Sequence, residues 1–329
     1  MDDSHNQTMT VNLQAVILAA GRGKRLQPLT DQRSKAMLPI LGKPIIQRVI
    51  EPLIINGVSD FILVTSPEDE AITRYFSRPK DLEANFRLVH QPQALGTADA
   101  LQYATPYIQG DFILSACDNL VTTLDAGKLL ATWKQHHNLN AILSLLPVEM
   151  ERLGSTGIVL WDGKWVSHVI EKPPPDKTPS NISSLPLYCF SPALLKYLPQ
   201  VPWSPRGEYE LADAIQLLIE REGNVLGLML SGRMTLSTVD DLLTINMHYL
   251  SHSQEAYDIQ AQALAAHVTL IPPIRIEKGV TIGKHCTLGP NVYLEESCTI
   301  GNRVTLQNAV VLCEASIPDG ETVNRKVVW

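Results

Sequence analysis

The sequence predicts an α/β fold, a doubly wound and mainly parallel sheet, followed by a short left-handed parallel β-helix. Two observations support this prediction. Short apolar segments alternate with segments of helical spacing through the first half of the chain, and an apolar six-residue repeat runs through its C-terminal part. Strand–helix–strand alternation is typical of doubly wound sheets. With 329 residues, the chain is long enough for one large domain and a smaller one.

The strands of the predicted sheet are short segments that are apolar throughout, as in parallel strands buried on both faces. Helical spacing separates them. We expect strands at 15–20, 61–65, 86–90, 112–115 and 141–146, with helices at 45–56, 68–76 and 97–107.

The middle of the chain is less regular. Asp162-Gly163 is a strong turn dipeptide, so a hairpin is expected over 159–172. Three prolines end it, and the stretch from there to Ser184 is predicted to be a loop. A strand is expected at 187–190, and helices at 210–221 and 240–251, the second leading into 256–267.

The C-terminal repeat has two columns of apolar residues with a constant period of six. A period of six is neither helical nor a simple strand alternation; it is typical of a left-handed β-helix, in which six residues form one side of a triangular coil. We expect two to three coils. The first column is Ile276, Ile282, Leu288, Leu294, Ile300, Leu306 and Leu312, and the second is Val280, Cys286, Val292, Cys298, Val304 and Val310.

Composition excludes several classes of protein. The net charge of −7 and the lack of a basic run make nucleic acid a poor partner. Five dispersed cysteines argue against a disulfide framework and a zinc site. No apolar run is long enough for a membrane span, and residues 1–12 resemble a frayed leader more than a signal peptide, so a cytoplasmic location is expected.

The most informative segment is Leu18-Ala-Ala-Gly-Arg-Gly-Lys-Arg-Leu-Gln-Pro-Leu-Thr30, which follows the first predicted strand. Gly21 and Gly23 allow a sharp turn whose backbone N–H groups suit phosphate oxygens. Arg25 and Lys35 add the positive charge that a departing pyrophosphate requires. We therefore expect a triphosphate-binding loop here.

This loop, together with Ser34-Lys-Ala-Met-Leu-Pro-Ile40 and Lys43-Pro44, resembles the signature of the sugar-1-phosphate nucleotidyltransferase family. The resemblance extends over about residues 13 to 318. It implies a Rossmann-like catalytic domain at 13–250, a helical connector at 251–269 and the β-helix at 270–329. It also implies attack by a sugar-1-phosphate on the α-phosphorus of an NTP with Mg²⁺, and nucleotide contacts from Leu18 and Ala20.

Gln91-Pro-Gln-Ala-Leu-Gly-Thr-Ala98 resembles the family's base-recognition segment. The amide of Gln91 can present a donor and an acceptor to a base edge. Gly96 would let the base lie against the backbone. The alternative is a loop with a helix N-cap at Thr97, and both interpretations can hold together.

The remaining site residues also come from the resemblance. Asp118 follows a predicted strand at the carboxyl end of the sheet and would bind Mg²⁺, although it could instead cap the next helix. On the sugar side, Glu171 would accept sugar hydroxyls and Lys172 would hold the sugar phosphate. Gly157, Asn181 and Arg206 lie in further sugar-side motifs.

The sequence departs from the family pattern at several of these motifs. Cys117, Pro186 and Ala212 replace a Gly, a Gly and a Thr. The family's second metal-binding Asp is Thr235 here, and a neutral hydroxyl is a weaker Mg²⁺ ligand than a carboxylate.

Two functions from different classes therefore remain. The first is an active nucleotidyltransferase, with UTP or dTTP and glucose-1-phosphate as favoured substrates. The second is a catalytically silent subunit that senses a nucleotide sugar. Acyl transfer by the β-helix would need a histidine such as His285, which fits a solvated corner better. The β-helix itself is expected to mediate homo- or hetero-oligomers through its coil ends and flat faces.

Overall fold

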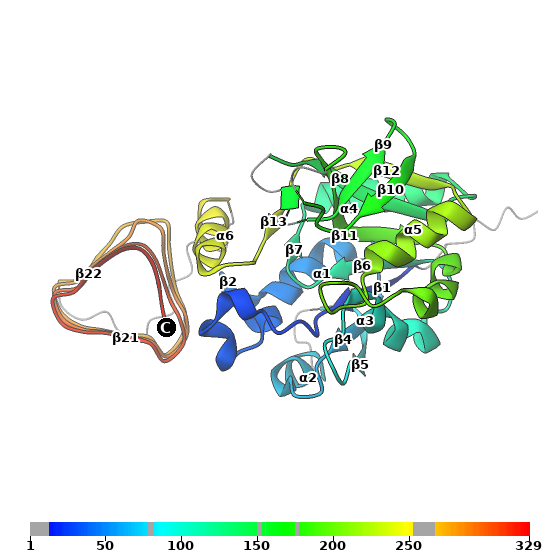
Figure 1. Cartoon of the computed structure of the whole chain (residues 1–329). Helices are drawn as coiled ribbons and strands as arrows, with labels where there is room; N and C mark the ends of the chain where they lie inside the picture. Colours follow the sequence, from blue (N-terminus) through cyan, green and yellow to red (C-terminus); the bar gives the residue numbers. More distant parts are fainter. Residues whose placement is uncertain (1–12, 78–81, 150–152, 155, 175–177, 253–266) are drawn as a thin grey trace, which may run out of the picture. The chain divides into compact units, whose positions relative to one another are not determined.

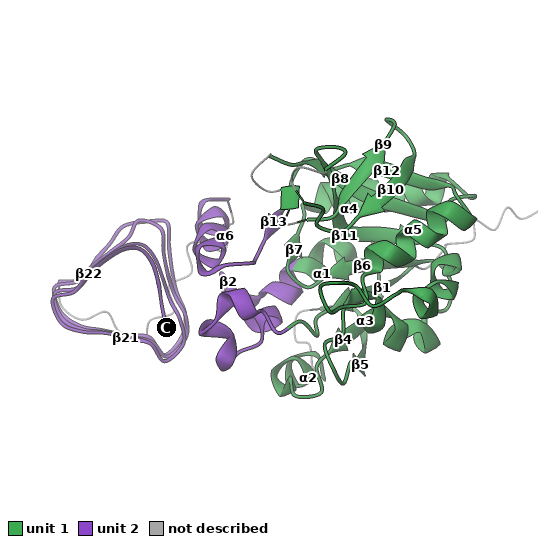
Figure 2. Cartoon of the chain, viewed as in Figure 1, with its two compact units in different colours: residues 1–21, 49–233 green, residues 22–48, 234–329 purple. Residues whose placement is uncertain are grey.

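The computed structural model describes residues 13–77, 82–149, 153–154, 156–174, 178–252 and 267–329 (Figure 1). The chain forms two compact units (Figure 2). Unit 1 contains residues 1–21 and 49–233, and unit 2 contains residues 22–48 and 234–329. The predicted leader and most of the predicted connector lie outside the described residues. The segment boundaries predicted at 250 and 269 stay predictions, because the two units group residues by contact and not by chain order.

Unit 1 is built on a mixed sheet. The strands of this sheet are β1 (Gln14–Leu18), β4 (Asp60–Thr65), β5 (Asn85–His90), β6 (Phe112–Ala116), β8 (Ala141–Pro147), β9 (Ile158–Trp161), β10 (Val166–Ile170), β11 (Ile182–Phe190) and β12 (Val225–Met229). Unit 1 also contains the short strand β7 (Asn119–Leu120), which lies outside this sheet. Its helices are α2 (Glu70–Ser77), α3 (Thr97–Ala104), α4 (Thr123–Gln135) and α5 (Leu211–Arg221), and α1 (Ile45–Ile55) crosses from unit 2 into unit 1.

The strand order in the sheet is β10-β9-β11-β6-β1-β4-β5, with β8 paired to β11 and β12. The pairs that β1 makes with β4 and β6 are parallel, as are β4 with β5 and β8 with β12. Strand β11 is antiparallel to both β6 and β8. The predicted doubly wound, mainly parallel fold is therefore confirmed, with the antiparallel strand β11 in its centre and the antiparallel pair β9–β10 at one edge.

Helices cover both faces of this sheet. Val16 and Leu114 belong to one core cluster with residues of α3 and α5, such as Leu101 and Ile215. Neighbouring strand residues such as Ile17 are equally buried but lie outside that cluster, since successive strand residues face opposite sides. Packing on both faces explains why the strand segments are apolar throughout.

Two local predictions for unit 1 were wrong. Strand β5 is not buried on both faces: it lies at the sheet edge, and only Val89 is buried. Strand β11 begins at Ile182, whereas residues up to Ser184 were expected to form a loop. The buried polar residues Ser183 and Ser184 disguise the start of this strand in the sequence.

Unit 2 contains the segment 22–48, one long helix and the C-terminal repeat. Its short elements are η1 (Lys24–Leu26), η2 (Leu29–Asp31), η3 (Lys35–Met37), β2 (Pro39–Ile40), β3 (Lys43–Pro44) and β13 (Met234–Thr235). The helix is α6 (Val239–His252). The repeat contains β14 (Thr269–Leu270), β15 (Ile274–Ile276), β16 (Thr281–Ile282), β17 (Thr287–Leu288), β18 (Val292–Leu294), β19 (Thr299–Ile300), β20 (Thr305–Val311), β21 (Ser316–Ile317) and β22 (Thr322–Val328).

The repeat forms the predicted β-helix, and Figure 1 shows its triangular outline. All pairs between successive coils are parallel. Two sides are four strands deep and the third is three deep, slightly more than the two to three coils expected. Residues at the corners have positive φ, His267, His285 and Arg303 among them. His285 is exposed at such a corner, as expected, and its ring stacks on His267.

The six-residue period breaks twice, which the sequence did not reveal. Thr287 pairs with Thr305, 18 residues on, whereas Val292 pairs with Ala309, only 17 residues on. Ala309 pairs in turn with Lys326, again 17 residues on, so each of the last two coils is one residue short. Val311 takes the core position predicted for Leu312, and Ala309 takes the one predicted for Val310. The predicted core positions and the observed ones are both occupied by apolar residues, so the sequence pattern does not reveal the shift.

One flat face of the β-helix is apolar on its outside. The column Tyr293, Val310 and Val327 points away from the β-helix core, yet each residue is buried. Helix α6 packs against the three strands that carry this column, β18, β20 and β22. This face of the β-helix is thus covered by the chain's own helix.

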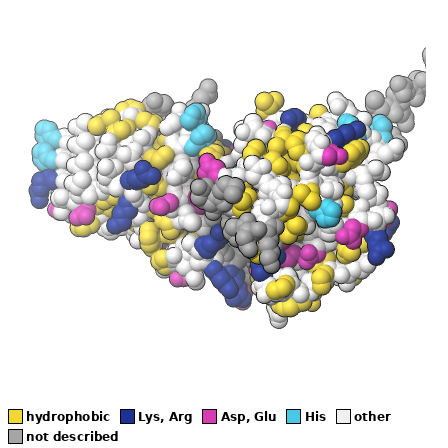
Figure 3. Space-filling model, turned by 45° about the horizontal axis from the view of Figure 1, so that its top comes forward, with side chains coloured by type: hydrophobic (Ala, Val, Ile, Leu, Met, Phe, Trp, Pro, Cys, Tyr) yellow, Lys and Arg dark blue, Asp and Glu magenta, His cyan; other side chains and the backbone are white. Residues whose placement is uncertain are grey.

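On the face drawn in Figure 3, Lys and Arg side chains lie in separate small groups. In the part of the chain that the structure describes, no helix is both long and apolar enough to cross a membrane.

Candidate functional site

The predicted triphosphate loop is divided between the two units. Leu18, at the end of β1, has its carbonyl bonded to Cys117 N, and Ala20 is buried beyond the strand. Gly21 is exposed, with no atom within 4 Å of the position of a Cβ. These three residues belong to unit 1 and form the strand end from which the loop departs.

The rest of the loop lies in unit 2, where Gly23 is its most constrained residue. Its φ is +62°, a conformation that favours glycine. A Cβ here would lie 3.1 Å from both Lys35 Cβ and Thr30 Cγ2. The Thr30 hydroxyl donates a hydrogen bond to the Gly23 carbonyl at 3.1 Å. The glycine therefore brings the turn directly against Lys35, while Arg25 on η1 is exposed to solvent.

The predicted base-recognition segment, in unit 1, is held by Gln91. This side chain is 4% exposed, and its Nε2 donates to Gly96 O at 3.1 Å and to Asp99 Oδ2 at 2.7 Å. Both amide hydrogens therefore fix the loop that precedes α3. A base contact from Gln91 would have to use its Oε1 atom.

Gly96 is required by a close backbone contact. Its φ is +116°, and a Cβ would lie 2.4 Å from Tyr209 O and 2.6 Å from Tyr209 N. Tyr209 N donates to Leu95 O, and Ala98 N donates to Tyr209 O. The hydroxyl of Thr97 accepts a hydrogen bond from Leu211 N at 3.1 Å. The segment 95–98 is thereby joined to residues 209–211, which carry a sugar-side motif.

The sugar-side residues Glu171, Lys172 and Arg206 lie together. Lys172 Nζ is 3.1 Å from Glu171 Oε1, and Arg206 Nη1 donates to the Glu171 carbonyl at 3.2 Å. Arg206 Nε also donates to Glu210 Oε1 at 3.0 Å, and Glu210 is buried. Lys172 has a positive φ of 43°, which is uncommon for a residue with a side chain and often marks a functional position.

This cluster is rich in carboxylates. Burial raises the pKa of Asp213, and the nearby charges of Glu210 and Glu171 raise it further, while Arg206 lowers it. Three carboxyl groups, those of Glu171, Glu210 and Asp213, lie near only two cations, Arg206 and Lys172, so carboxylates outnumber the positive charges in this cluster. Such a cluster suits a ligand that presents several hydroxyl groups.

Ser184 belongs to this neighbourhood, although the sequence analysis placed it in a loop. A Cβ on Gly157 would lie 3.0 Å from Glu171 Oε2 and 3.1 Å from Ser184 Oγ. Ser184 N also donates to Gly157 O. By contrast, the contacts among the described residues do not connect the exposed Asn181 with this cluster. A signal in the sequence could have located Ser184. It lies two residues before Pro186, which occupies the position of a glycine in the family pattern.

Asp118 lies between β6 and β7 and is half-buried. The next residue, Asn119, is 1% exposed, and both its Oδ1 and Nδ2 lack a hydrogen-bond partner among the described residues. A carboxylate at the end of a strand fits Mg²⁺, which takes one or two protein carboxylates and completes its coordination with phosphate and water oxygens. No group of three or more metal-binding side chains occurs in the described ranges. Thr235, on β13, is half-buried in unit 2.

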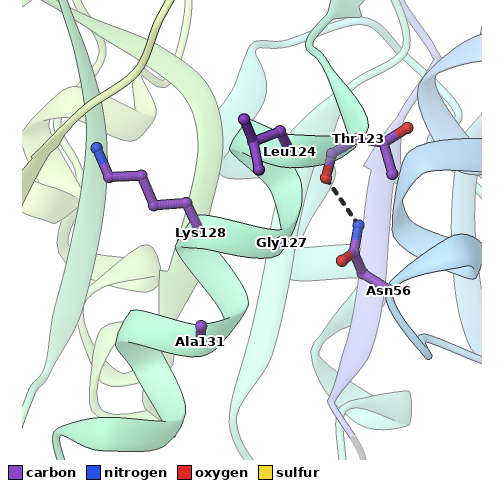
Figure 4. Close-up of a pocket in the computed structure, with 6 residues that line it drawn as sticks. All are labelled: Asn56, Thr123, Leu124, Gly127, Lys128 and Ala131. Carbon is purple, nitrogen blue, oxygen red and sulfur yellow. Dashed lines mark hydrogen bonds between the residues drawn. The ribbon is translucent and has the colours of Figure 1, made fainter.

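Unit 1 also has an open pocket of about 510 Å³ that none of the predicted site residues lines (Figure 4). Asn56 Nδ2 donates to Thr123 O across it at 2.9 Å. A Cβ on Gly127 would lie 2.6 Å from Asn56 Oδ1. This pocket is therefore a packing groove between the end of α1 and the first turns of α4.

Two family models match the chain. One, described as nucleotidyl transferase, matches residues 14–252, and one described as the GMPPB C-terminal domain matches residues 270–328. Bifunctional protein GlmU of Methanococcus maripaludis is 32% identical over 240 residues, which are 73% of this chain and 55% of that protein. The chain thus spans about half the length of such bifunctional relatives.

A shorter relative is covered more fully. UTP–glucose-1-phosphate uridylyltransferase AglF of Haloferax volcanii is 32% identical over 215 residues, 65% of this chain and 86% of that protein. Among solved structures, a UDP-glucose pyrophosphorylase complexed with UDP-glucose has a TM-score of 0.66 at 21% identity. That similarity covers 73% of this chain and 98% of the other, and it shows the fold.

Proposed function

Because the chain belongs to the nucleotidyl transferase family, we propose that it joins an NTP and a sugar-1-phosphate to form an NDP-sugar and pyrophosphate. The observation that supports this best is the Gly23 turn. Its positive φ and its contact with Lys35 place backbone amides and a lysine side by side in a loop that also carries Arg25. Backbone amides and cations together are the usual surroundings of a bound triphosphate.

UTP and glucose-1-phosphate are the favoured substrates, with dTTP as the alternative nucleotide. The name of the AglF relative specifies UTP and glucose-1-phosphate. The excess of carboxylates around Arg206 agrees with a neutral, hydroxyl-rich sugar ring.

The reaction needs no general base from the protein. A sugar phosphate is already anionic at neutral pH, so its oxygen attacks the α-phosphorus directly, and the bond to the leaving pyrophosphate breaks in line. Arg25 and Lys35 would stabilise the charge of the triphosphate, and Lys172 would hold the attacking phosphate. Mg²⁺ held by Asp118 would supply additional charge neutralisation at the phosphates.

The other proposed contacts give specificity. Gly96 and Thr97 shape the loop against which the base would lie, and Gln91 fixes that loop. Glu171 would accept hydroxyls of the sugar. Gly157 keeps the space beside Glu171 clear, since a side chain there would meet both Glu171 and Ser184.

The test is pyrophosphate release by the purified full chain with Mg²⁺, a panel of NTPs and a panel of sugar-1-phosphates. Release with UTP and glucose-1-phosphate, faster than with other pairs, is the expected result. Absence of release with every pair, together with tight binding of UDP-glucose, would refute the enzyme and support the silent, ligand-sensing subunit.

Assembly through the β-helix is a further part of the proposal. The face formed by β18, β20 and β22 is covered by α6, so the last coil, ending in β22, is the surface proposed for docking between copies. Arg325 and Lys326 are exposed on that strand. Reversing both charges to Glu should reduce the mass measured by light scattering; an unchanged mass would contradict assembly at this end.

A further inference from the structure

The segment that carries Lys35 is joined to the β-helix within unit 2. Two residues before Lys35, Arg33 Nη1 donates to Glu295 Oε1 of the β-helix at 2.6 Å. The other oxygen of Glu295 accepts a hydrogen bond from Cys313 N at 2.7 Å. Glu295 is 12% exposed and Arg33 30% exposed, so this ion pair is shielded from water far more than a surface pair.

A second contact fixes the end of the same segment. Strands β2 and β3 are joined by the two residues Leu41 and Gly42, both with positive φ (46° and 81°). Such two-residue turns favour Asn and Gly, and a leucine with positive φ is strained. Tyr293, buried on the outer face of the β-helix that α6 covers, accepts a hydrogen bond from Gly42 N at 3.1 Å.

The strained turn is also held from α6. Asn246 is fully buried; its Oδ1 accepts from Leu41 N, and its Nδ2 donates to Pro39 O. Arg48 donates to the carbonyls of Ile40 and Leu41 and stacks over the ring of Tyr249. A strained backbone persists only where its surroundings determine it strongly. Here those surroundings are α6 and the β-helix.

Lys35 lies between these two anchored points. It is the first residue of η3, and its carbonyl accepts a hydrogen bond from Leu38 N. Strand β2 begins at the next residue, Pro39. The backbone of Lys35 therefore depends on both the Arg33 contact and the Leu41-Gly42 turn. We propose that Glu295 and Tyr293 of the β-helix are positioning residues that hold the segment 33–42, and with it Lys35, in the conformation that binds the triphosphate. This inference rests on the proposed function of Lys35.

The test compares three variants of the full chain: Glu295→Gln, Tyr293→Phe and, as a matched control, Glu296→Gln. Glu296 follows Glu295 directly, but it is exposed and forms a long, exposed ion pair with Lys278 at 3.8 Å. Hydrogen exchange of the Leu41 and Gly42 amides is measured without ligand. The affinity for UTP with Mg²⁺ is measured by calorimetry.

Tyr293→Phe removes the acceptor of the Gly42 amide and should speed exchange of that amide at least tenfold. Glu295→Gln removes the charge that holds Arg33, so it should weaken UTP about tenfold and speed exchange at Leu41 and Gly42 to a smaller extent. Glu296→Gln should change neither quantity more than twofold. In steady-state assays, KM for UTP should rise while KM for glucose-1-phosphate stays constant, because Glu171 and Lys172 belong to unit 1. A merely structural role would raise both.

Unchanged exchange at Leu41 and Gly42 in both variants would overturn the inference, as would faster exchange with wild-type UTP affinity. If Glu295→Gln fails to fold, Tyr293→Phe decides the question alone. A wild-type chain that binds no NTP would refute the proposed function of Lys35. The exchange data would then still decide whether the β-helix holds the segment.

Discussion

The two units present their site residues in opposite ways. In unit 1, Gln91, Arg206 and Glu171 are joined to neighbouring loops by hydrogen bonds before any ligand arrives. In unit 2, the backbone around Gly23 is fixed, whereas Arg25 is exposed. Preorganised polar groups favour recognition of a particular ligand, because little ordering remains to be done on binding. Exposed cations contribute mainly charge. We infer that unit 1 determines specificity, whereas unit 2 supplies the cations Arg25 and Lys35 proposed for the triphosphate.

The largest effect that would test this comparison is expected for Arg25→Ala. If Arg25 acts on the departing pyrophosphate as proposed, removing its charge should lower kcat/KM by about 100- to 1000-fold. The melting temperature should stay the same, because Arg25 is exposed. Pyrophosphate release and a thermal scan measure the two quantities. Arg74→Ala on α2, also exposed, is the control and should retain full activity. A large loss of stability in Arg25→Ala would contradict the division between charge and scaffold.

Gly96→Ala should act in the opposite way, through stability. The new Cβ would meet the backbone of Tyr209 at 2.4 Å in a conformation that L residues rarely adopt. We expect a loss of about 3 kcal/mol in the free energy of unfolding. Urea denaturation measures it, with Gly232→Ala as control, since nothing lies within 4 Å of a Cβ there. A variant as stable as the wild type would contradict the close contact between Gly96 and the backbone of Tyr209.

Much of the fold of both units was predictable from the sequence, because it depends on local patterns of apolar and turn residues. Strand–helix alternation gave the sheet, and the six-residue columns gave the β-helix, because each reflects burial of one face at a fixed period. Asp162-Gly163 was expected to turn a hairpin, and β9 and β10 form it. Gly23 was recognisable as a turn residue because few residue types adopt its positive φ, whereas nothing in the described part of the structure requires a glycine at Gly21.

The rest depends on contacts between residues far apart in the chain. Nothing near Arg33 indicates that Glu295, 262 residues later, would pair with it. Ser184 looked like loop because a serine in a buried strand has no apolar pattern. The first of the two one-residue shortenings of the β-helix was hidden because Val311 and Leu312 are both apolar and buried.

Thr235→Asp tests whether unit 2 has lost a metal-binding carboxylate. If the second metal carboxylate has been lost there, restoring it should raise kcat about tenfold, equivalent to about 1.4 kcal/mol in the barrier. The gain should be largest at low Mg²⁺, because a second carboxylate strengthens metal binding. Thr238→Asp, three residues further along and exposed, is the matched control. Equal rates for Thr235→Asp and wild type at every Mg²⁺ concentration would contradict the metal-site interpretation.

The smallest expected effect concerns the carboxylate cluster of unit 1. The pKa of Asp213 is raised above 3.8, first by burial and then by Glu210 and Glu171, so the folded chain keeps this proton to a higher pH than the unfolded chain. The stability that Asp213 contributes is therefore complete below pH 3.8 and is lost as pH rises through the raised pKa. Asp213→Asn cannot ionise, so its stability relative to wild type should increase from pH 4 to pH 7 in urea titrations.

Asp240→Asn is the matched control for this titration, because Asp240 also lies in the first turn of a helix but is exposed. It should follow the wild-type pH dependence. Since Asp213 is only partly buried, solvent reduces the effect, and a shift of the urea midpoint of a few tenths molar is the most we expect. If Asp213→Asn were instead less stable than wild type at pH 7 by as much as at pH 4, the carboxylates of unit 1 would not repel one another. That result would also contradict the proposal that an excess of carboxylates in this cluster recognises the sugar hydroxyls.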